Sequence, residues 1–426
     1  MNDDVLNSIQ AERSEASESH IMVVGVGGGG SNAVNFMREL HIQDVNYMVC
    51  NTDQQALDIS PVELKVRLGA SGEGAGNNPA EGRRAAIESL DVIKQSFQNY
   101  STKMVFIAAA MGGGTGTGAS PVIAKLAREM GILSVAIVTT PIRDEGPLRY
   151  QQALEGIEEL RQSVDSLLII DSDHIAKMAL NMKFNDAMSL PDKVLASAAK
   201  GIAEIITIKS SRTNIDFADV SRVLRNRGRT HMGVGRAAGE NRAEVAARSA
   251  LNAPLLDSCS IRGARTILLN ISCVDSESLV YNELMTILKV IQSEAKYIDE
   301  RGKLRIADII WGNSEKADLG EDLEVIVVAT NFAEVDPKAV VTEPATDEDT
   351  DETENTDVNA DESTDEIADD PTNEIATEQE QSEEQSDERK RPQITSRTVW
   401  EELKSIANRV ISTVEEALGD QDDCKF

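Results

Sequence analysis

The chain has 426 residues, of which 41% are hydrophobic, so it is long enough for two globular domains with their own cores and for tails besides. Its formal net charge of -31 at pH 7 argues against general binding to nucleic acids or anionic membranes, because these polyanions attract basic surfaces. The four cysteines and four histidines lack the spacing of metal ligands, and no secretory signal or membrane-spanning apolar run occurs. We therefore expect a cytoplasmic protein without a metal site of its own.

The N-terminal half alternates short apolar runs with helical patterns. After a polar tail over residues 1–20, which we expect to be disordered, strands are predicted at 21–27, 45–51, 104–113, 133–140 and 166–171. Helices are predicted between them at 31–40 and 80–97. Strands that alternate with helices form a largely parallel sheet covered on both faces, so we predict a first α/β domain over residues 21–190.

A long helix and a second domain are predicted to follow. Pro191 is typical of a first helical turn, and apolar residues recur at helical spacing after it, which indicates a central helix over residues 191–210. Beyond it come the segment NIDFADV, a pair of helices broken by glycines, a helix at 280–295 and strands at 265–272, 306–313 and 323–332. This order predicts a smaller α/β domain with a mixed sheet over residues 211–333.

The C-terminal part has the composition of a tether. Between Val341 and Glu388 there are 21 acidic and no basic residues, so residues 334–391 are expected to form a disordered, self-repelling linker. Within residues 392–426, one helical face would carry Trp400, Leu403, Ala407, Val410, Ile411, Val414 and Leu418. We expect this amphipathic segment to bind a protein partner rather than to insert into a membrane.

Two glycine-rich turns each follow an apolar strand and open a helix. The first reads VVGVGGGGSNAV and the second AAAMGGGTGTGASPV. Backbone N–H groups at such a helix N-terminus can hold phosphate, and glycine permits the close approach that a Cβ would block. Neither turn contains G-x-x-x-x-G-K-[ST], which argues against a Walker-type nucleotidase.

The first turn alone leaves another hypothesis open. Gly25, Gly27 and Gly30 fit the G-x-G-x-x-G pattern of dinucleotide-binding proteins, and Asp44 or Asp53 could serve as the acidic residue that contacts ribose. A nicotinamide-dependent dehydrogenase would, however, leave GGGTGTG and NIDFADV without a role.

Several separate motifs between about Ile21 and Phe332 resemble the tubulin/FtsZ family. GGGTGTG, at Gly112 to Gly118, is similar to the tubulin signature loop, and GGGGSNAVN, NTDQQAL, TPIRDEG, NIDFADV and GVGRAAGENRAEVAA look like FtsZ-type segments in the same order. The resemblance implies a parallel-sheet nucleotide-binding domain joined by a long central helix to a smaller α/β domain. It also implies binding of GTP and GDP, with Mg2+ accompanying the nucleotide.

The resemblance assigns candidate nucleotide-binding residues in several loops. Asn51, Thr52 and Asp53 would lie near the site, and Gly72 to Pro79 would form the loop that senses the γ-phosphate. Met188 takes the place of the family's stacking aromatic ring, and Ser172 that of its strand-end asparagine. The implied nucleotide contacts are Gly27, Gly28, Gly29, Asn32, Gly112, Gly113, Gly114, Thr115, Gly116, Thr117, Glu145, Arg149, Met188 and Asp192.

The resemblance also implies a catalytic loop that acts on a neighbouring subunit. Asn214, Asp216 and Asp219 would dock onto the nucleotide of the next molecule, where a carboxylate orients or deprotonates the attacking water. The chain is then expected to be a GTPase that forms head-to-tail filaments at the midcell division site, with regulatory or membrane-anchoring partners on the C-terminal segment. A GTP-binding scaffold without turnover remains an alternative.

Overall fold

The computed structural model describes residues 19–40, 42, 44–208, 213–252, 261–275, 277–299 and 301–332, all within one compact unit. Most of the predicted N-terminal tail, the whole acidic linker and the C-terminal segment lie outside the described residues. Among the described helices, none is both long and apolar enough to cross a membrane.

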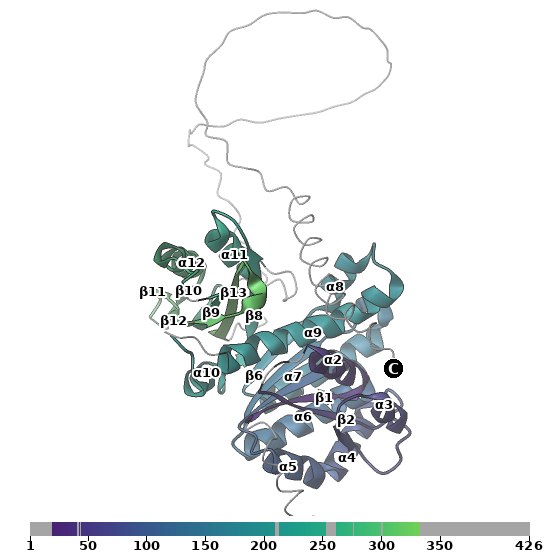
Figure 1. Ribbon diagram of the computed structural model, residues 1–426. Coiled ribbons are helices and arrows are strands. Elements are labelled where there is room, and N and C mark those ends of the chain that lie inside the picture. The colour runs from purple at the N-terminus through teal and green to yellow at the C-terminus, as the bar shows by residue number, and fades with distance from the viewer. Residues whose placement is uncertain are drawn as a thin grey trace, which may run out of the picture. The chain divides into compact units, whose positions relative to one another are not determined.

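The first sheet has seven parallel strands in the order β3-β2-β1-β4-β5-β6-β7, as the alternation of strands and helices predicted (Figure 1). The strands are β1 (Ile21–Val26), β2 (Asn46–Asn51), β3 (Leu64–Arg67), β4 (Met104–Ala110), β5 (Leu133–Thr139), β6 (Ser166–Ile170) and β7 (Gly228–Arg229). The chain builds outward from β1 to β3 and then returns to place β4 on the other side of β1.

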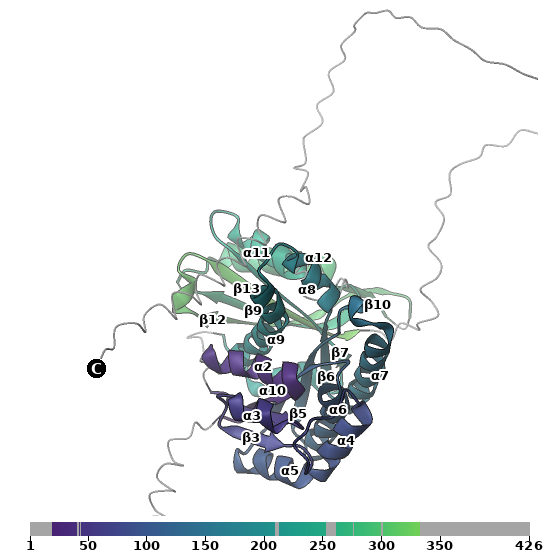
Figure 2. The same ribbon diagram turned by 90° about the vertical axis from the view of Figure 1, so that its right-hand side faces the viewer.

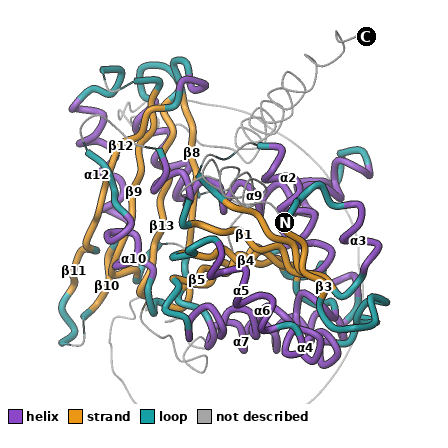
Figure 3. The backbone as a smooth tube through the Cα atoms, turned by 60° about the horizontal axis from the view of Figure 1, so that its bottom comes forward, coloured by secondary structure: helices purple, strands orange, loops and turns teal. Residues whose placement is uncertain are grey.

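Helices cover both faces of this sheet, which explains why the strands are apolar on both sides (Figure 2). One face packs against α2 (Gly27–Glu39), α3 (Gln54–Ile59), α8 (Ser172–Ala179), α9 (Phe184–Thr207) and α10 (Phe217–Leu224). The other packs against α4 (Pro79–Glu88), α5 (Leu90–Asn99), α6 (Gly114–Glu129) and α7 (Pro147–Ser163), which follows the short 3-10 helix η1 (Arg143–Glu145). Figure 3 shows α4 to α7 together on one side of the strands.

The central helix α9 begins at Phe184, seven residues before the predicted start at Pro191. A proline inside a helix removes one backbone hydrogen bond but does not prevent earlier turns from forming. The first turn of α9 keeps its backbone hydrogen bond, which Ala187 N donates to the carbonyl of Lys183 at 2.9 Å. The proline therefore lies within the helix instead of starting it.

The second sheet is mixed, as predicted, with the order β12-β9-β13-β8. Its strands are β8 (His231–Ala237), β9 (Ala264–Cys273), β12 (Asp308–Glu315) and β13 (Leu323–Phe332), and only β12 and β9 are parallel. One face packs against α11 (Arg242–Leu251) and α12 (Tyr281–Glu294). The short strands β10 (Lys296–Ile298) and β11 (Leu304–Ile306) form a separate antiparallel pair, and η2 (Ala317–Leu319) precedes β13.

Strand β8 occupies part of the region where the glycines predicted a broken pair of helices. A Cβ on Gly233 would overlap the carbonyl oxygen of Ala250, and one on Gly235 would overlap that of Ala246. The glycines thus allow α11 to approach the strand closely, a role that glycine can have inside strands. Helix α10 and strand β7 also pack with the first sheet, although the sequence placed residues 211–333 in the second domain.

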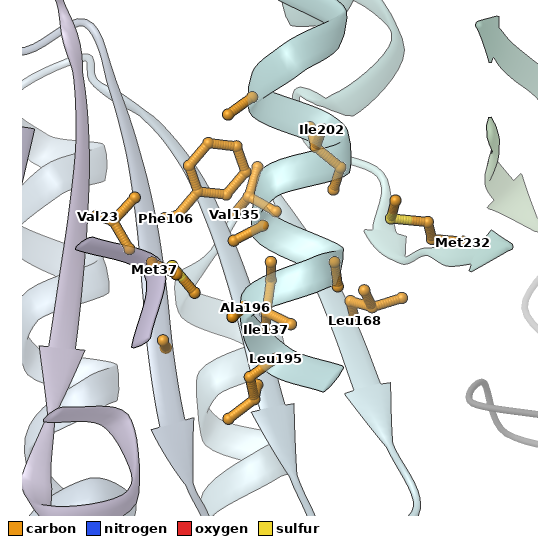
Figure 4. Packing of buried hydrophobic residues seen from close by; sticks show 14 of the residues in the cluster. Val23, Met37, Phe106, Val135, Ile137, Leu168, Leu195, Ala196, Ile202 and Met232 are labelled. Atoms are coloured by element: carbon orange, nitrogen blue, oxygen red, sulfur yellow. The ribbon is translucent and has the colours of Figure 1, made fainter. Parts of the chain in front are cut away.

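Helix α9 packs against both sheets. Its apolar residues Leu195 and Ile202 belong to the same cluster as Phe106 of β4 and Met232 of β8 (Figure 4). Gly201 allows this contact, because a Cβ there would overlap the end of the Met232 side chain. The helix is therefore a shared part of both hydrophobic cores.

An ion-pair network also joins α9 to the second domain. The Nζ of Lys316 lies 2.7 Å from a carboxylate oxygen of Glu204 in α9 and 2.6 Å from one of Glu324 in β13. Burial alone would lower the pKa of Lys316, but the two carboxylates outweigh it and hold that pKa above its usual value. The charged form of the lysine is therefore a structural requirement.

We expect Lys316→Met to lower the free energy of unfolding by about 3–5 kcal/mol, because Glu204 and Glu324 lose the largely buried cation that they share. The matched control is Lys200→Met, whose ammonium is more exposed and lies 3.6 Å from Glu204, and which should cost at most about 1 kcal/mol. Urea unfolding of both variants measures the difference. Equal losses would contradict the structural role of Lys316.

Candidate functional site

The two glycine-rich turns meet at the point where the strand order reverses. Strands β1 and β4 are parallel neighbours; α2 follows β1 directly, and α6 follows β4 after a short turn. In open α/β sheets, ligands bind outside the carboxyl ends of the strands at this kind of switch point. The fold therefore places both predicted turns at the most favourable position for a ligand.

Helices α2 and α6 begin without a side-chain cap. The N-cap residues, Val26 and Gly113, have no side chain that can accept a hydrogen bond from the first turn, and neither helix has an acidic residue there. By contrast, Asp53, Asn78 and Asp171 cap α3, α4 and α8. Free backbone N–H groups and the positive end of the helix dipole therefore remain available for an anion at both glycine-rich turns.

Close backbone contact between the two turns explains several of the glycines. Gly27 has a φ of 72°, and a Cβ there would lie 2.8 Å from the backbone nitrogen of Gly116. A Cβ on Gly116 would overlap the carbonyl oxygen of Ala110, and one on Gly29 would lie 2.6 Å from the Cβ of Ala110. The two turns can therefore pack side by side only because these three positions are glycine.

Threonine hydroxyl groups add to this arrangement. The Thr117 hydroxyl accepts a hydrogen bond from the Gly112 N–H at 2.8 Å, and the Thr115 hydroxyl lies 2.6 Å from that of Thr52. Both contacts are buried, so Thr117 shapes its own turn and Thr115 joins it to the end of β2.

Gly28 and Gly113 are different, because the fold itself does not require them to be glycine. A Cβ on either residue would meet no atom within 4 Å. Gly113 has an extended conformation, with φ -93° and ψ 178°, that any residue can adopt. Side chains at these two positions would instead fill the space in front of the helix N-termini, so their absence points to a ligand that approaches the backbone.

The predicted γ-phosphate loop closes against the second turn. Its backbone pairs with the end of β2, because Gln54 N donates to the Gly72 carbonyl at 3.0 Å and Gly74 N to the Thr52 carbonyl at 3.1 Å. A Cβ on Gly114 would lie 2.8 Å from both the Ala75 Cβ and the Asn78 nitrogen. The structure thus brings residues 72–79, Thr52 and the glycines of α6 together.

Glu145 and Arg149 also reach this region. Their side chains form an ion pair at 2.8 Å across the turn that opens α7. The Cγ and carbonyl oxygen of Arg149 would each lie 2.9 Å from a Cβ on Gly112, which has a φ of 95°. The surface ion pair therefore borders the second glycine-rich turn, where a ribose could contact it.

A hollow of about 240 Å³ lies between α2 and α9, lined by Asn32, Asn35, Phe36, Glu39, Ser189, Asp192 and Lys193. It brings together Asn32 and Asp192, two residues that the sequence implicated separately. Met188 is on the same helix as Asp192 with 62% of its surface exposed, so it is free to pack on a ligand. Ser172, in contrast, is buried at the start of α8.

Phe36 is a lining residue that the sequence analysis missed. It lies four residues after Asn32 in α2, the spacing that places two side chains on one helical face, and this was the signal that could have identified it. An aromatic ring beside Asp192 provides a flat apolar surface that Met188 alone would not supply.

Burial raises the pKa of the Asp192 carboxyl to about 7. The carboxyl group is thus close to its titration midpoint at neutral pH. A ligand that donates hydrogen bonds to it would favour the charged form and lower that pKa.

The predicted catalytic residues lie beyond the opposite end of α9. Asp192 lies in the first half of α9, and from there to Thr207 the helix runs for about 22 Å at 1.5 Å per residue. Asn214, Asp216 and Asp219 follow, at the start of α10, and Figure 1 shows α8 and α10 at opposite ends of α9. These three residues therefore do not join the glycine-rich turns within one molecule.

Asp216 and Asp219 form a capping box at the start of α10. The Asp216 carboxylate accepts from the Asp219 N–H at 2.8 Å, whereas the reciprocal contact, from the Asp216 N–H to the Asp219 carboxylate, is 3.5 Å long. Asp216 is thus engaged in capping, and Asp219 is held only weakly. Of the two carboxylates, Asp219 is the more available for chemistry.

Two further observations concern the dehydrogenase hypothesis and a possible metal site. Asp53, which a dinucleotide site could use for ribose, accepts hydrogen bonds from Gln55 N and Ala56 N and so caps α3. Within the described part of the chain, no group of three or more His, Cys, Asp or Glu side chains is arranged to hold a metal ion.

Comparison with known proteins agrees with this geometry. Residues 20–179 match the family model described as Tubulin/FtsZ family, GTPase domain, and residues 228–333 match that of the FtsZ family, C-terminal domain. The chain is 41% identical over 315 residues to the cell division protein FtsZ of Porphyromonas gingivalis, covering 73% of this chain and 67% of that protein. It is also 41% identical over 331 residues to FtsZ of Rickettsia bellii, covering 77% and 70%.

A solved structure is similar as well. The empty FtsZ dimer of M. jannaschii has a TM-score of 0.65 and 34% sequence identity, over 78% of this chain and 92% of that chain. Both the predicted fold class and the family resemblance are therefore confirmed, and the GTPase is favoured over the dehydrogenase.

The two classes of glycine can be separated by stability measurements without any ligand. Gly113→Ala should change the free energy of unfolding by at most about 0.5 kcal/mol, because its Cβ meets nothing. Gly116→Ala should cost about 1–3 kcal/mol, because its Cβ would overlap the Ala110 carbonyl and force the backbone to shift. Urea unfolding tests both; a comparable loss for Gly113→Ala would contradict the open space in front of α6.

Asp192→Asn should stabilise the protein at pH 8 but not at pH 4. A carboxyl group whose pKa rises from 3.8 to about 7 on folding contributes stability below pH 4 that is lost as the pH rises toward 7. One pKa unit corresponds to about 1.4 kcal/mol, and partial exposure reduces the effect, so we expect a gain of about 1–2 kcal/mol. Unfolding curves at the two pH values measure it, and a gain independent of pH would refute the assignment.

Proposed function

Because this chain belongs to the tubulin/FtsZ family of GTPases, we propose that it binds GTP between the two glycine-rich turns and α9 and hydrolyses it during head-to-tail assembly. The observation that carries the proposal is the pair of uncapped helices at the switch point of the sheet, with open space in front of Gly28 and Gly113. A polyphosphate is the ligand that two such helix N-termini would bind together.

The triphosphate would lie across both turns. Backbone N–H groups at Gly28, Gly29 and Gly113 would face it, and the Gly72–Pro79 loop, already paired to the end of β2, would contact its γ-phosphate. Four residues of that loop, Gly72, Gly74, Gly76 and Asn77, have positive φ, so its course depends on residues that adopt this conformation readily. Mg2+ bound to the phosphate oxygens would offset their charge.

The base would occupy the hollow between α2 and α9. Guanine has a ring N–H next to its exocyclic amino group, and the two oxygens of an ionised Asp192 can accept one hydrogen bond from each. Adenine lacks this pair of donors. Phe36 and Met188 would pack on the base, and Glu145 with Arg149 would contact the ribose beside Gly112. Removing the Asp192 carboxyl group should therefore weaken the preference for guanine more than it weakens phosphate binding.

Hydrolysis would need a second subunit. The glycine-rich turns and Asp219 lie toward opposite ends of α9, so the nucleotide of one molecule would meet Asp219 of the next in a head-to-tail filament. There the weakly held carboxylate would orient or deprotonate the attacking water, while Asp216 caps α10 and Asn214 adds a polar contact. The similar M. jannaschii FtsZ has been solved as a dimer, which supports self-association of this chain.

The cellular role follows from the relatives. Their description as cell division proteins supports action in the cytoplasm at the division site, with the C-terminal segment available to regulatory or membrane-anchoring partners. A scaffold that binds GTP without turnover is disfavoured by the presence of Asp219 on an exposed helix start.

The basic test is phosphate release and sedimentation with GTP or ATP in the presence of Mg2+. Phosphate release and pelleting should occur with GTP and be at least about tenfold weaker with ATP, a difference of about 1.4 kcal/mol. Equal rates with both nucleotides would rule out the assignment of Asp192 to the guanine base, and no release with either would favour the scaffold.

Mixing two inactive variants tests whether the site is shared. Asp219→Ala should bind GTP but hydrolyse it at least about 100-fold more slowly, in the range expected for losing a general base. Gly113→Val should fold but fail to bind GTP, while keeping an intact Asp219. In a mixture, GTP on the first variant would meet Asp219 of the second, so part of the activity should return.

The mixture requires its own control. Co-sedimentation of differently labelled variants must show that they assemble together. If they do and the mixture stays as inactive as its components, Asp219 does not act on a neighbouring molecule.

A further inference from the structure

The hairpin formed by β10 and β11 has an exposed apolar face that no other described element covers. Lys296 pairs with Ile306, and Ile298 with Leu304, so these four side chains point to the same side. Ile298, Leu304 and Ile306 are 66%, 62% and 55% exposed. Three large aliphatic side chains gathered on a short hairpin are more than the scattered apolar residues of an ordinary surface.

The opposite face of the hairpin is attached to the body of the domain. Tyr297 lies under the guanidinium group of Arg265 in β9, 5.7 Å from ring centre to Cζ, and the Lys296 carbonyl accepts a hydrogen bond from the Gly263 N–H at 2.9 Å. The hairpin is thus held in place by one face, and its apolar face is presented outward.

Basic residues outnumber acidic ones along residues 296–306, with Lys296, Arg301, Lys303 and Arg305 against Asp299 and Glu300. Within the part of the chain that the structure describes, Lys296, Arg301 and Lys303 form no ion pair, although each lies in or next to the hairpin. Lys296 lies on the same side as Ile298, Leu304 and Ile306, so its long side chain can extend over them while its charge remains in water. The surface therefore fits an occupant that is apolar on one side and acidic at its border.

We propose that this face binds the chain's own C-terminal segment, Trp400–Leu418. That segment lies outside the described residues, but its sequence has the required chemistry. It carries apolar residues at the spacing of one helical face, together with four acidic residues, Glu401, Glu402, Glu415 and Glu416, against two basic ones. An amphipathic helix laid on an apolar surface with charged borders is a common mode of peptide recognition.

The course of the chain makes this contact accessible. Phe332, the last described residue, pairs with Ala264 in the sheet, and the neighbouring Gly263 donates its N–H to the carbonyl of Lys296 at 2.9 Å. The linker therefore starts beside the base of the hairpin. The 68 residues from there to Trp400 would span about 45 Å as a flexible coil, and self-repulsion of the acidic residues would extend them further.

Tethering makes even a weak site effective. A flexible linker supplies an effective concentration on the order of 1 mM, so a site of millimolar intrinsic affinity would be about half occupied within one molecule. Opposite charges at the border would make this occupancy decrease as salt is added.

The fluorescence of Trp400 can report binding of the C-terminal segment in the full chain. Of the two tryptophans in the sequence, Trp311 lies in β12, so Trp311→Phe leaves Trp400 as the only one. Without nucleotide and at a concentration too low for assembly, Leu304→Glu in this background should raise acrylamide quenching of Trp400 about twofold, as expected for a half-occupied site. Ile59→Glu, at an apolar residue that is 84% exposed on α3, is the matched control and should leave the quenching unchanged.

If acrylamide quenches Trp400 equally in the Trp311→Phe protein with and without Leu304→Glu, the proposal is overturned. Thermal unfolding must show that both proteins are folded. Photo-crosslinking separates the possible occupants. A photoreactive benzoylphenylalanine in place of Ile306 should give a crosslinked peptide from residues 400–418, on the same molecule or a second copy. Crosslinks to residues 19–332 of another copy, or no crosslink at all, would show that the C-terminal segment is not the occupant.

Discussion

Burial of α9 between two sheets is the constraint on which the rest of the structure depends. Leu195 and Ile202 complete the core against the first sheet, and Gly201 lets Met232 of the second sheet approach. A helix held on both sides cannot bend or slide easily, because well-packed interiors do not deform continuously. Asp192 in its first half and Asp219 beyond its end are therefore kept apart at a defined separation, which gives the molecule two chemically different ends.

The glycines of the site serve two purposes that the structure distinguishes. Gly27 and Gly116 allow two backbone turns to pack against each other, whereas Gly28 and Gly113 leave space that the fold does not use. The first pair is needed to build the site, and the second pair keeps it open. Both purposes favour glycine, so the sequence motif alone could not show which glycine serves which purpose. The contacts that a Cβ would make at each position distinguish the two pairs.

Much of the fold could be predicted because local patterns agreed with the tertiary structure. The strands around Val23, Phe106 and Val135 are apolar on both sides, as parallel strands covered by helices must be. The start of α9 and the strand β8 could not be predicted, since Pro191 and the glycines at 233 and 235 have local preferences that packing overrides. For the site, the motifs located the turns, but the hollow that joins Phe36 to Asp192 depends on how α2 and α9 cross and has no signature in either segment alone.

The strand order of the second sheet has a consequence for how the protein emerges from the ribosome. Among the described strands, β8 lies at the edge of that sheet and pairs only with β13, which ends at Phe332, whereas the first sheet is complete once β7 has been made at Arg229. At the usual speed of synthesis, β8 waits roughly 5–20 s for its partner. During that interval α11 can already cover one face of β8 through Gly233 and Gly235, but the hydrogen-bonding edge of β8 stays open to other nascent chains until β13 pairs with it.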